Sequence, residues 1–240
     1  MNRVLVTGGA GTIGAAVVRR LLRDPAWEVR VSDQRAAPDW MAGTCELQRA
    51  DLRSAADARA AVSGCSHVIH LAAIVGGIAN FHKLPHTLTE VNNALYNAVF
   101  RAALDEDVER FTYVSSSMVF EQAEQYPTRE DYLDDCPVPL SAYGFSKLTG
   151  EVYCRALHDE HGLPYTICRP FNAYGPGELP DSEPLDAVLD GADAVVVATN
   201  HSAFEALLDR LPEGTLLVDP WNVTGAGAVF DVVHAPVPAE

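Results

Sequence analysis

The sequence predicts an α/β fold, in which a doubly wound parallel sheet is followed by a short, atypical C-terminal α/β segment. β-Rich stretches alternate with stretches whose apolar residues recur at helical spacing. This alternation is typical of crossover units on a parallel sheet. A glycine-rich turn directly follows the first predicted strand. Residues 174–184, rich in Gly, Pro and acidic side chains, predict a boundary between a domain at 1–177 and a segment at 178–240.

The predicted elements alternate from the first residues onward. The first helix has Ala15, Val18 and Leu21 at helical spacing, and the long central helix has Leu88, Val91, Leu95 and Val99. In chain order we expect strand 3–7, helix 14–23, strand 27–32, helix 55–62, strand 67–72, helix 88–104, strand 110–115, helix 145–158 and strand 165–169. The C-terminal segment is expected to contain strand 194–199, helix 202–211, strand 215–218 and a Pro-containing tail from residue 235.

Composition and charge exclude several classes of partner. The 240 residues are 48% hydrophobic, enough for a core, and 17 Lys and Arg face 33 Asp and Glu, for a net charge of −16. Such a surface repels phosphate backbones and anionic lipids, so we expect no nucleic-acid partner and no membrane partner. No apolar run reaches the roughly 18–20 residues of a membrane helix.

The cysteines and histidines argue against a disulfide framework and a metal site. Five widely spaced cysteines without a CxxC pair favour reduced thiols in a cytoplasmic protein. His67 and His70 are predicted on opposite faces of a strand, and His158 and His161 end a predicted helix. We therefore expect no bound metal.

The first turn has the spacing Gly8-x-x-Gly11-x-x-Gly14, between a strand and a helix. Missing side chains let the backbone turn tightly and approach a pyrophosphate, whose charge meets the amides and dipole at the helix start. This context predicts dinucleotide binding on a Rossmann-type sheet, although a glycine pattern alone would only indicate a tight turn.

Asp33 follows the second predicted strand, 19 residues beyond Gly14. A carboxylate there accepts hydrogen bonds from ribose hydroxyls and repels a 2′-phosphate, which favours NAD over NADP. Arg35, two residues further on, would soften that exclusion.

Tyr143 and Lys147 are four residues apart at the start of a predicted helix, so they share one face. A free Tyr has a pKa near ~10, and a nearby ammonium favours its phenolate. Tyr143 is therefore a candidate base, and Ser116, at a strand end, a candidate partner on the same substrate oxygen. The alternative for this pair is a solvated helix face.

These motifs occur in the order in which they occur in the extended short-chain dehydrogenase/reductase superfamily. Residues 1–177 resemble its NAD-dependent nucleotide-sugar epimerase/dehydratase branch. The resemblance implies an NAD cofactor, a nucleotide-sugar substrate and a homodimer through helices 88–104 and 145–158. It implies the catalytic residues Ser116, Tyr143 and Lys147. It implies cofactor contacts from Gly8, Gly11, Thr12, Ile13, Gly14, Asp33, Asp51, Leu52, Leu71, Ala72, Ala73, Asn92, Tyr143 and Lys147. It implies substrate contacts from Ser117, Arg169 and Asn172.

Family members begin by oxidising a sugar hydroxyl, usually at C4. In the dehydratases an Asp-Glu pair follows the catalytic Ser. The decarboxylases have a Glu at the second of these two positions, and the GDP-sugar 3,5-epimerases and fucose synthases have a Cys there. In this chain the two positions hold Ser117 and Met118. The simplest remaining chemistry is re-reduction on the other face, a 4-epimerase. A polar loop with His82, Lys83 and His86 is an alternative source of acid or base, and residues 73–78 are similar to the GDP-sugar group.

Beyond Gly177 the sequence departs from this branch. Residues 190–201 and 217–222 resemble the tail of UDP-glucose/GDP-mannose dehydrogenases, with Trp221 where those enzymes prefer Arg. The segment is therefore a candidate nucleotide-sugar-binding piece, or alternatively an extension of the same sheet. A shortened C-terminal half leaves two rivals to the epimerase: a non-catalytic NAD-binding subunit or regulator, and a nucleotide-sugar dehydratase or reductase.

Overall fold

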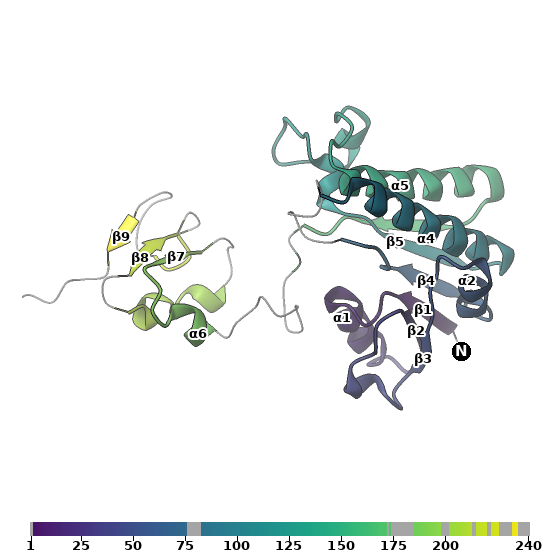
Figure 1. The fold of residues 1–240 in the computed structure, drawn as a ribbon, viewed down its shortest axis with the longest axis horizontal. Helices are drawn as coiled ribbons and strands as arrows, with labels where there is room; N and C mark the ends of the chain where they lie inside the picture. Colours follow the sequence, from purple (N-terminus) through teal and green to yellow (C-terminus); the bar gives the residue numbers. More distant parts are fainter. Residues whose placement is uncertain are drawn as a thin grey trace, which may run out of the picture. The chain divides into compact units, whose positions relative to one another are not determined.

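The computed structural model describes residues 2–75, 83–171, 173, 185–197, 202–212, 215–219, 222–225 and 232–234. The chain divides into two compact units, Met1–Glu178 and Leu179–Glu240 (Figure 1). Each unit has its own sheet and its own hydrophobic core.

The first unit is built on a six-stranded sheet of order β3-β2-β1-β4-β5-β6, in which every neighbouring pair is parallel. Its strands are β1 (Asn2–Thr7), β2 (Trp27–Asp33), β3 (Glu46–Arg49), β4 (His67–His70), β5 (Arg110–Val114) and β6 (Tyr165–Cys168). The order reverses between β1 and β4, where parallel sheets of this type bind ligands beyond the carboxyl ends of the strands. The predicted doubly wound sheet is confirmed.

Helices cover both faces of this sheet (Figure 1). The helices are α1 (Thr12–Leu21), α2 (Ala55–Val62), α4 (Pro85–Asp105) and α5 (Ala142–His161), with single 3₁₀ turns η1 (Asp39–Met41), η2 (Ser117–Phe120) and η3 (Glu130–Asp134). On one face, α2, α4 and α5 pack around a core that includes Leu5, Phe100 and Phe111. On the other face, α1 packs on Val4 and Val31. Alternate residues of β1 therefore enter opposite cores, as expected for a strand buried on both sides.

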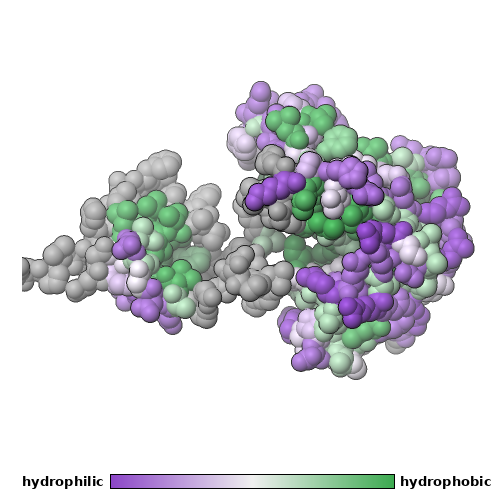
Figure 2. Space-filling model, viewed as in Figure 1, coloured by the Kyte–Doolittle hydropathy of each residue, from purple (hydrophilic) through white to green (hydrophobic). Residues whose placement is uncertain are grey.

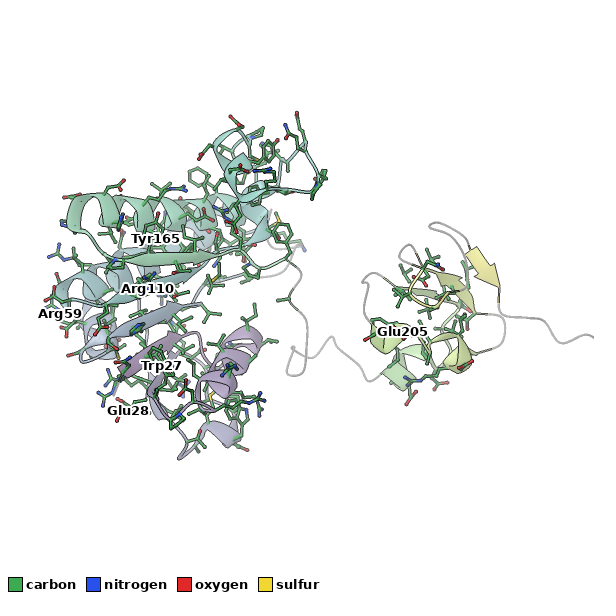
Figure 3. All side chains as sticks on the ribbon, turned by 180° about the vertical axis from the view of Figure 1, so that it is seen from behind. Trp27, Glu28, Arg59, Arg110, Tyr165 and Glu205 are labelled. Carbon is green, nitrogen blue, oxygen red and sulfur yellow. The ribbon has the colours of Figure 1, made fainter. Side chains whose placement is uncertain are left out.

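The amino ends of the strands lie away from the glycine turn. Trp27, Arg110 and Tyr165 begin β2, β5 and β6 and are labelled in Figure 3. Arg110 Nη1 donates to the Tyr165 carbonyl oxygen at 3.2 Å, which joins two of these strand starts. Polar side chains cover much of the visible surface of this unit (Figure 2). Among the described residues, no helix is long and apolar enough to span a membrane.

The second unit has a three-stranded sheet of order β7-β8-β9, formed by β7 (Ala194–Val196), β8 (Leu216–Val218) and β9 (Val232–His234). β7 and β8 are parallel, and β8 and β9 are antiparallel. The alternative in which these strands extend the larger sheet is wrong, because they form a sheet of their own. A short helix α6 (Leu185–Leu189) packs with it around Leu189, Val197, Leu207 and Leu217.

The predicted helix over residues 202–211 is wrong. This stretch forms two 3₁₀ turns, η4 (Ser202–Phe204) and η5 (Leu208–Arg210). Backbone bonds three residues apart replace helical ones, for example from Leu207 N to Phe204 O at 3.0 Å. A stretch this short gains little from helix propagation, so packing of Phe204 and Leu207 on the small core decides its shape.

Candidate active site

The glycine turn joins β1 to α1 at the carboxyl edge of the sheet. A Cβ on Gly8, whose φ is +69°, would lie 2.9 Å from the Ala72 amide nitrogen, and a Cβ on Gly14 would lie 2.3 Å from the Gly8 carbonyl oxygen. Neither position has room for a side chain. The N-cap of α1 is Gly11, which has no side chain that could cap the helix start in place of a bound anion. The turn therefore keeps backbone N–H groups available for a phosphate, as its sequence predicts.

Thr7 links this turn to the end of β4. Its Oγ1 accepts hydrogen bonds from the amides of Leu71 and Ala72, both at 3.2 Å, and lies 2.8 Å from Nδ1 of His70. Since the hydroxyl accepts from both amides, its one proton is donated to Nδ1, which makes His70 neutral. Burial, together with the charge of Lys147, lowers the pKa of His70 to about 3, in agreement with that assignment.

Asp33 is held beside the glycine turn. Its Oδ2 accepts from the Ala10 amide at 3.0 Å, and its Oδ1 accepts from the Arg35 amide at 2.9 Å. The guanidinium of Arg35 lies 3.5 Å from Oδ1 and reaches over Gly11. A carboxylate has about four acceptor positions, so Asp33 keeps acceptor capacity for ribose hydroxyls.

Asp51 and Leu52, two of the predicted cofactor contacts, lie in different environments. Asp51 is paired with Arg53, whose Nε lies 2.9 Å from Oδ1, and the hydrogen bonds from Arg53 hold the pKa of Asp51 at about 2. Leu52 is buried in the core beneath α2 and α4. Cofactor contact by either residue stays a prediction.

Ser116, Tyr143 and Lys147 come together from β5 and α5. A hydrogen bond with Ser116 lowers the pKa of Tyr143, but burial outweighs it and the pKa lies above its ordinary value. The Lys147 Nζ donates to the Val114 carbonyl oxygen at 2.8 Å and lies 5.9 Å from the centre of the Tyr143 ring. Burial lowers the pKa of Lys147 to about 8. Ser116 thus joins two residues of α5 in one cluster, in which a buried cation lies close to a phenol.

Asn92 connects the segment that follows β4 to helices α4 and α5. Its Oδ1 accepts from the Ile74 amide at 2.8 Å, while its Nδ2 lies 3.2 Å from both the Ile74 carbonyl oxygen and Ser146 Oγ. The side chain is completely buried. Asn92 therefore fixes the segment after Leu71, Ala72 and Ala73, and its direct contact with a cofactor stays a prediction.

The predicted substrate contacts lie beside the same cluster. The Ser117 amide donates to the Pro170 carbonyl oxygen at 3.1 Å. One edge of the Arg169 guanidinium donates to Glu151, through Nε at 2.9 Å and Nη2 at 2.8 Å. Asn172 lies outside the described residues. Ser117, Arg169 and Asn172 as substrate contacts therefore remain predictions.

Glu151 is the residue that the motifs did not single out. It is fully buried, and it also accepts a 2.6 Å hydrogen bond from Ser115 Oγ. Its sequence signal is its place four residues after Lys147 and eight after Tyr143, on the same stripe of the helix.

The polar loop considered as a second source of acid or base is only partly described. His82 lies outside the described residues. Lys83 is exposed, and His86 is exposed with Nδ1 3.8 Å from Glu90. Within the part of the chain that the structure describes, no three His, Cys, Asp or Glu side chains gather closely enough to hold a metal ion.

Comparison with known proteins places this site in a family. A model of the NAD dependent epimerase/dehydratase family matches residues 4–201, and the chain belongs to that family. The resemblance that the glycine turn and the Tyr143–Lys147 pair indicated is confirmed. The family includes both epimerases and dehydratases, so membership does not fix the reaction.

Individual relatives have several different activities in their names. A Bacillus subtilis (strain 168) protein named as an uncharacterized UDP-glucose epimerase is 28% identical over 194 residues, which are 75% of this chain and 59% of that protein. A probable GDP-L-fucose synthase of Drosophila melanogaster is 32% identical over 182 residues, which are 73% of this chain and 53% of the relative. The chain thus spans little more than half the length of these curated relatives.

A solved structure supports the fold. A double mutant of the dTDP-glucose 4,6-dehydratase of Streptomyces venezuelae, with NAD bound, has a TM-score of 0.69 and 28% identity. The similarity covers 83% of this chain and 66% of that one. The parallel sheet with flanking helices is therefore shared with an NAD-bound member of the family.

Proposed function

We propose that this chain binds NAD and uses it to oxidise and then re-reduce one carbon of a nucleotide sugar, most simply C4. The observation that carries the proposal is the cluster of Ser116, Tyr143 and Lys147 at the carboxyl edge of the sheet, the same edge that carries the glycine turn. These residues bring a phenol, a hydroxyl and a buried ammonium to the edge where the fold binds dinucleotides.

The residues of the cofactor edge fit a dinucleotide. Gly8 and Gly14 leave no space for side chains, so a pyrophosphate could approach the backbone closely. Asp33 is anchored through Ala10 with acceptor capacity remaining, which suits a ribose diol and disfavours a 2′-phosphate. When bound, NAD supplies the acceptor and donor of hydride. The chain's own residues hold it and manage the proton.

Tyr143 is the proposed base. In this structure burial raises its pKa, so the phenolate needs support from neighbouring groups. The ammonium of Lys147 supplies positive charge, and Ser116 supplies a hydrogen bond. Tyr143 then takes the proton of the sugar hydroxyl and later returns it to the same oxygen. Ser116 orients that oxygen.

The residue two positions after Ser116 supports epimerisation over elimination. Met118 packs with Leu88, Ala142 and Tyr143 in a small apolar cluster. A thioether has no proton to exchange, and Ser117 has no carboxylate, so these positions offer no acid or base for a neighbouring carbon. Re-reduction on the opposite face requires none.

A second candidate function is a non-catalytic NAD-binding protein. It is favoured by the burial of Tyr143, which raises the pKa of that residue and so disfavours the phenolate that a catalytic base needs. A homodimer through α4 and α5 belongs to the first proposal and is supported by apolar side chains on α5: Phe145 and Val152, seven residues apart, are about half exposed.

The proposal is tested with purified protein, NAD and a panel of UDP- and GDP-sugars, in which the C4 epimers are separated by chromatography. We expect turnover with at least one sugar, and we expect Tyr143→Phe to lower kcat by about 10²–10⁴-fold. The dissociation constant for NAD should stay the same in the variant. Binding of NAD without turnover of any sugar would overturn the epimerase and leave the second candidate.

A further inference from the structure

We propose that Glu151 is a positioning residue for the reaction: by tying the ends of β5 and β6 to α5, it sets the place of Ser116 relative to Tyr143. The inference rests on the proposed function, because it assigns a task within the same site. Glu151 itself lies too deep to touch a substrate, being completely buried.

The first step of the argument is the helix that carries Glu151. Tyr143, Lys147 and Glu151 are successive residues of one stripe on α5, all buried. Gly150, next to Glu151, lets the helix approach β5 closely, because a Cβ there would lie 2.2 Å from the Tyr113 hydroxyl. The helix is therefore pressed against the strand that leads to Ser116, as Figure 1 shows for α5 and β5.

The second step is that residues on both sides of Ser116 are tied to Glu151. Ser115 Oγ donates directly to Glu151 Oε1 at 2.6 Å. Ser117 is tied indirectly, because its amide donates to the Pro170 carbonyl oxygen and the neighbouring Arg169 binds both oxygens of Glu151. The segment around Ser116 is thus held from two directions by one carboxylate.

The third step is that the network is charged and largely buried. Arg169 is 15% exposed and Glu151 is not exposed at all. Paired charges in such surroundings hold a fixed geometry, because separating them leaves one ion buried without a partner. A rigid support of this kind suits a residue whose hydrogen bond to Tyr143 depends on its exact position, since a misplacement of 1 Å can cost about 10²-fold in rate.

The test is a double-mutant cycle on turnover. We expect Glu151→Gln to lower kcat by about 10²-fold with the NAD dissociation constant unchanged. In a Ser116→Ala background the same substitution should cost less than about twofold, because the residue it positions is gone. Equal losses in the two backgrounds would overturn the proposal and leave Glu151 a structural residue.

Two variants guard the test. Ser115→Ala removes one hydrogen bond to Glu151 without leaving a buried charge unpaired, so it decides the question if Glu151→Gln does not fold. It should lower kcat by less than Glu151→Gln does. In a Ser116→Ala background it should have no further effect on kcat. Glu46→Gln is the matched control, because it removes a carboxylate from the Glu46–Arg30 pair on β3 and β2. It should leave kcat unchanged.

A readout without turnover separates this proposal from the proposed function. The pKa of Tyr143 is measured by ¹³C NMR of tyrosine labelled at Cζ and assigned with Tyr143→Phe. Because Ser116 lowers that pKa, Glu151→Gln should raise it as Ser116→Ala does. An unchanged Tyr143 pKa in a folded Glu151→Gln protein overturns the positioning role even if no sugar is turned over.

Discussion

The buried lysine shows what a residue of the proposed catalytic cluster costs in stability. The sequence has two lysines; Lys83 is exposed and Lys147 is 4% exposed. Lys147 donates one hydrogen bond, to a carbonyl oxygen, and no carboxylate of the described residues forms an ion pair with it, so burial of its ammonium is costly. That cost lowers the pKa of Lys147 to about 8, so at pH 7 the ammonium still places a positive charge beside Tyr143.

The pH dependence of stability follows from the sign of this shift. Below pH 8 both folded and unfolded chains carry the Lys147 proton, and the folded state bears the full cost of burying it, on the order of 3 kcal/mol. Between pH 8 and the unfolded pKa near 10.5 only the unfolded chain stays protonated, so stability rises with pH. Lys147→Met should therefore be more stable than the wild type at pH 7.

Urea unfolding at pH 7 and pH 9.5 measures this effect. The stabilisation by Lys147→Met should shrink at the higher pH, whereas Lys83→Met should change stability little at either pH. A stabilisation that is the same at both pH values would contradict a buried, charged Lys147.

At the scale of elements, α5 carries two of the three residues of the proposed catalytic cluster, Tyr143 and Lys147. Ser141 caps this helix by accepting from the Gly144 amide at 3.0 Å, and the Ser141 amide donates to Glu121 at 2.8 Å. Ser54 caps α2 in the same way, accepting from the Asp57 amide at 3.3 Å. Only the first of these caps orders a turn that carries a proposed catalytic residue, Tyr143.

The two caps form a matched pair for experiment. Ser141→Ala and Ser54→Ala should each lower the free energy of unfolding by about 1 kcal/mol. Only Ser141→Ala should also lower kcat, because the first turn of α5 carries Tyr143. Stability is measured by urea unfolding and kcat with the best sugar of the panel; equal kcat values in both variants would argue against this link.

The elements also show what the sequence could and could not foretell. Local periodicity is enough to predict α1, α4 and α5. The order of the motifs is enough to predict the glycine turn and the Ser116–Tyr143–Lys147 cluster. Strand β3 was not predicted, because it is an edge strand whose residues Glu46–Arg49 are mostly polar. The role of Glu151 depends on Ser115 and Arg169, 36 and 18 residues away, and no local pattern encodes such pairings.

At the scale of the whole molecule, the two units have separate cores of unequal size. The first unit contains two large clusters, whereas the described part of the second has four fully buried apolar side chains at its centre. The proposed domain boundary therefore leads us to expect two unfolding transitions, with the second unit melting first.

Calorimetry of the full chain with and without NAD checks this expectation. NAD at 100 times its dissociation constant should stabilise the unit that binds it by about 2.7 kcal/mol. At about 2–4 °C per kcal/mol, the transition of the first unit should rise by roughly 5–10 °C while the other stays in place. A single transition that shifts as a whole would contradict independent units.

The strand order has a consequence for the newborn chain. β6 is the last strand of the larger sheet, yet Cys168 and Pro170 provide the carbonyl oxygens that receive the amides of Ser115 and Ser117. Neighbouring parallel strands are joined by crossover connections, so each strand pairing forms between residues that are distant in sequence. During synthesis, the backbone around Ser116 can therefore adopt its final position only after the residues around 170 have left the ribosome.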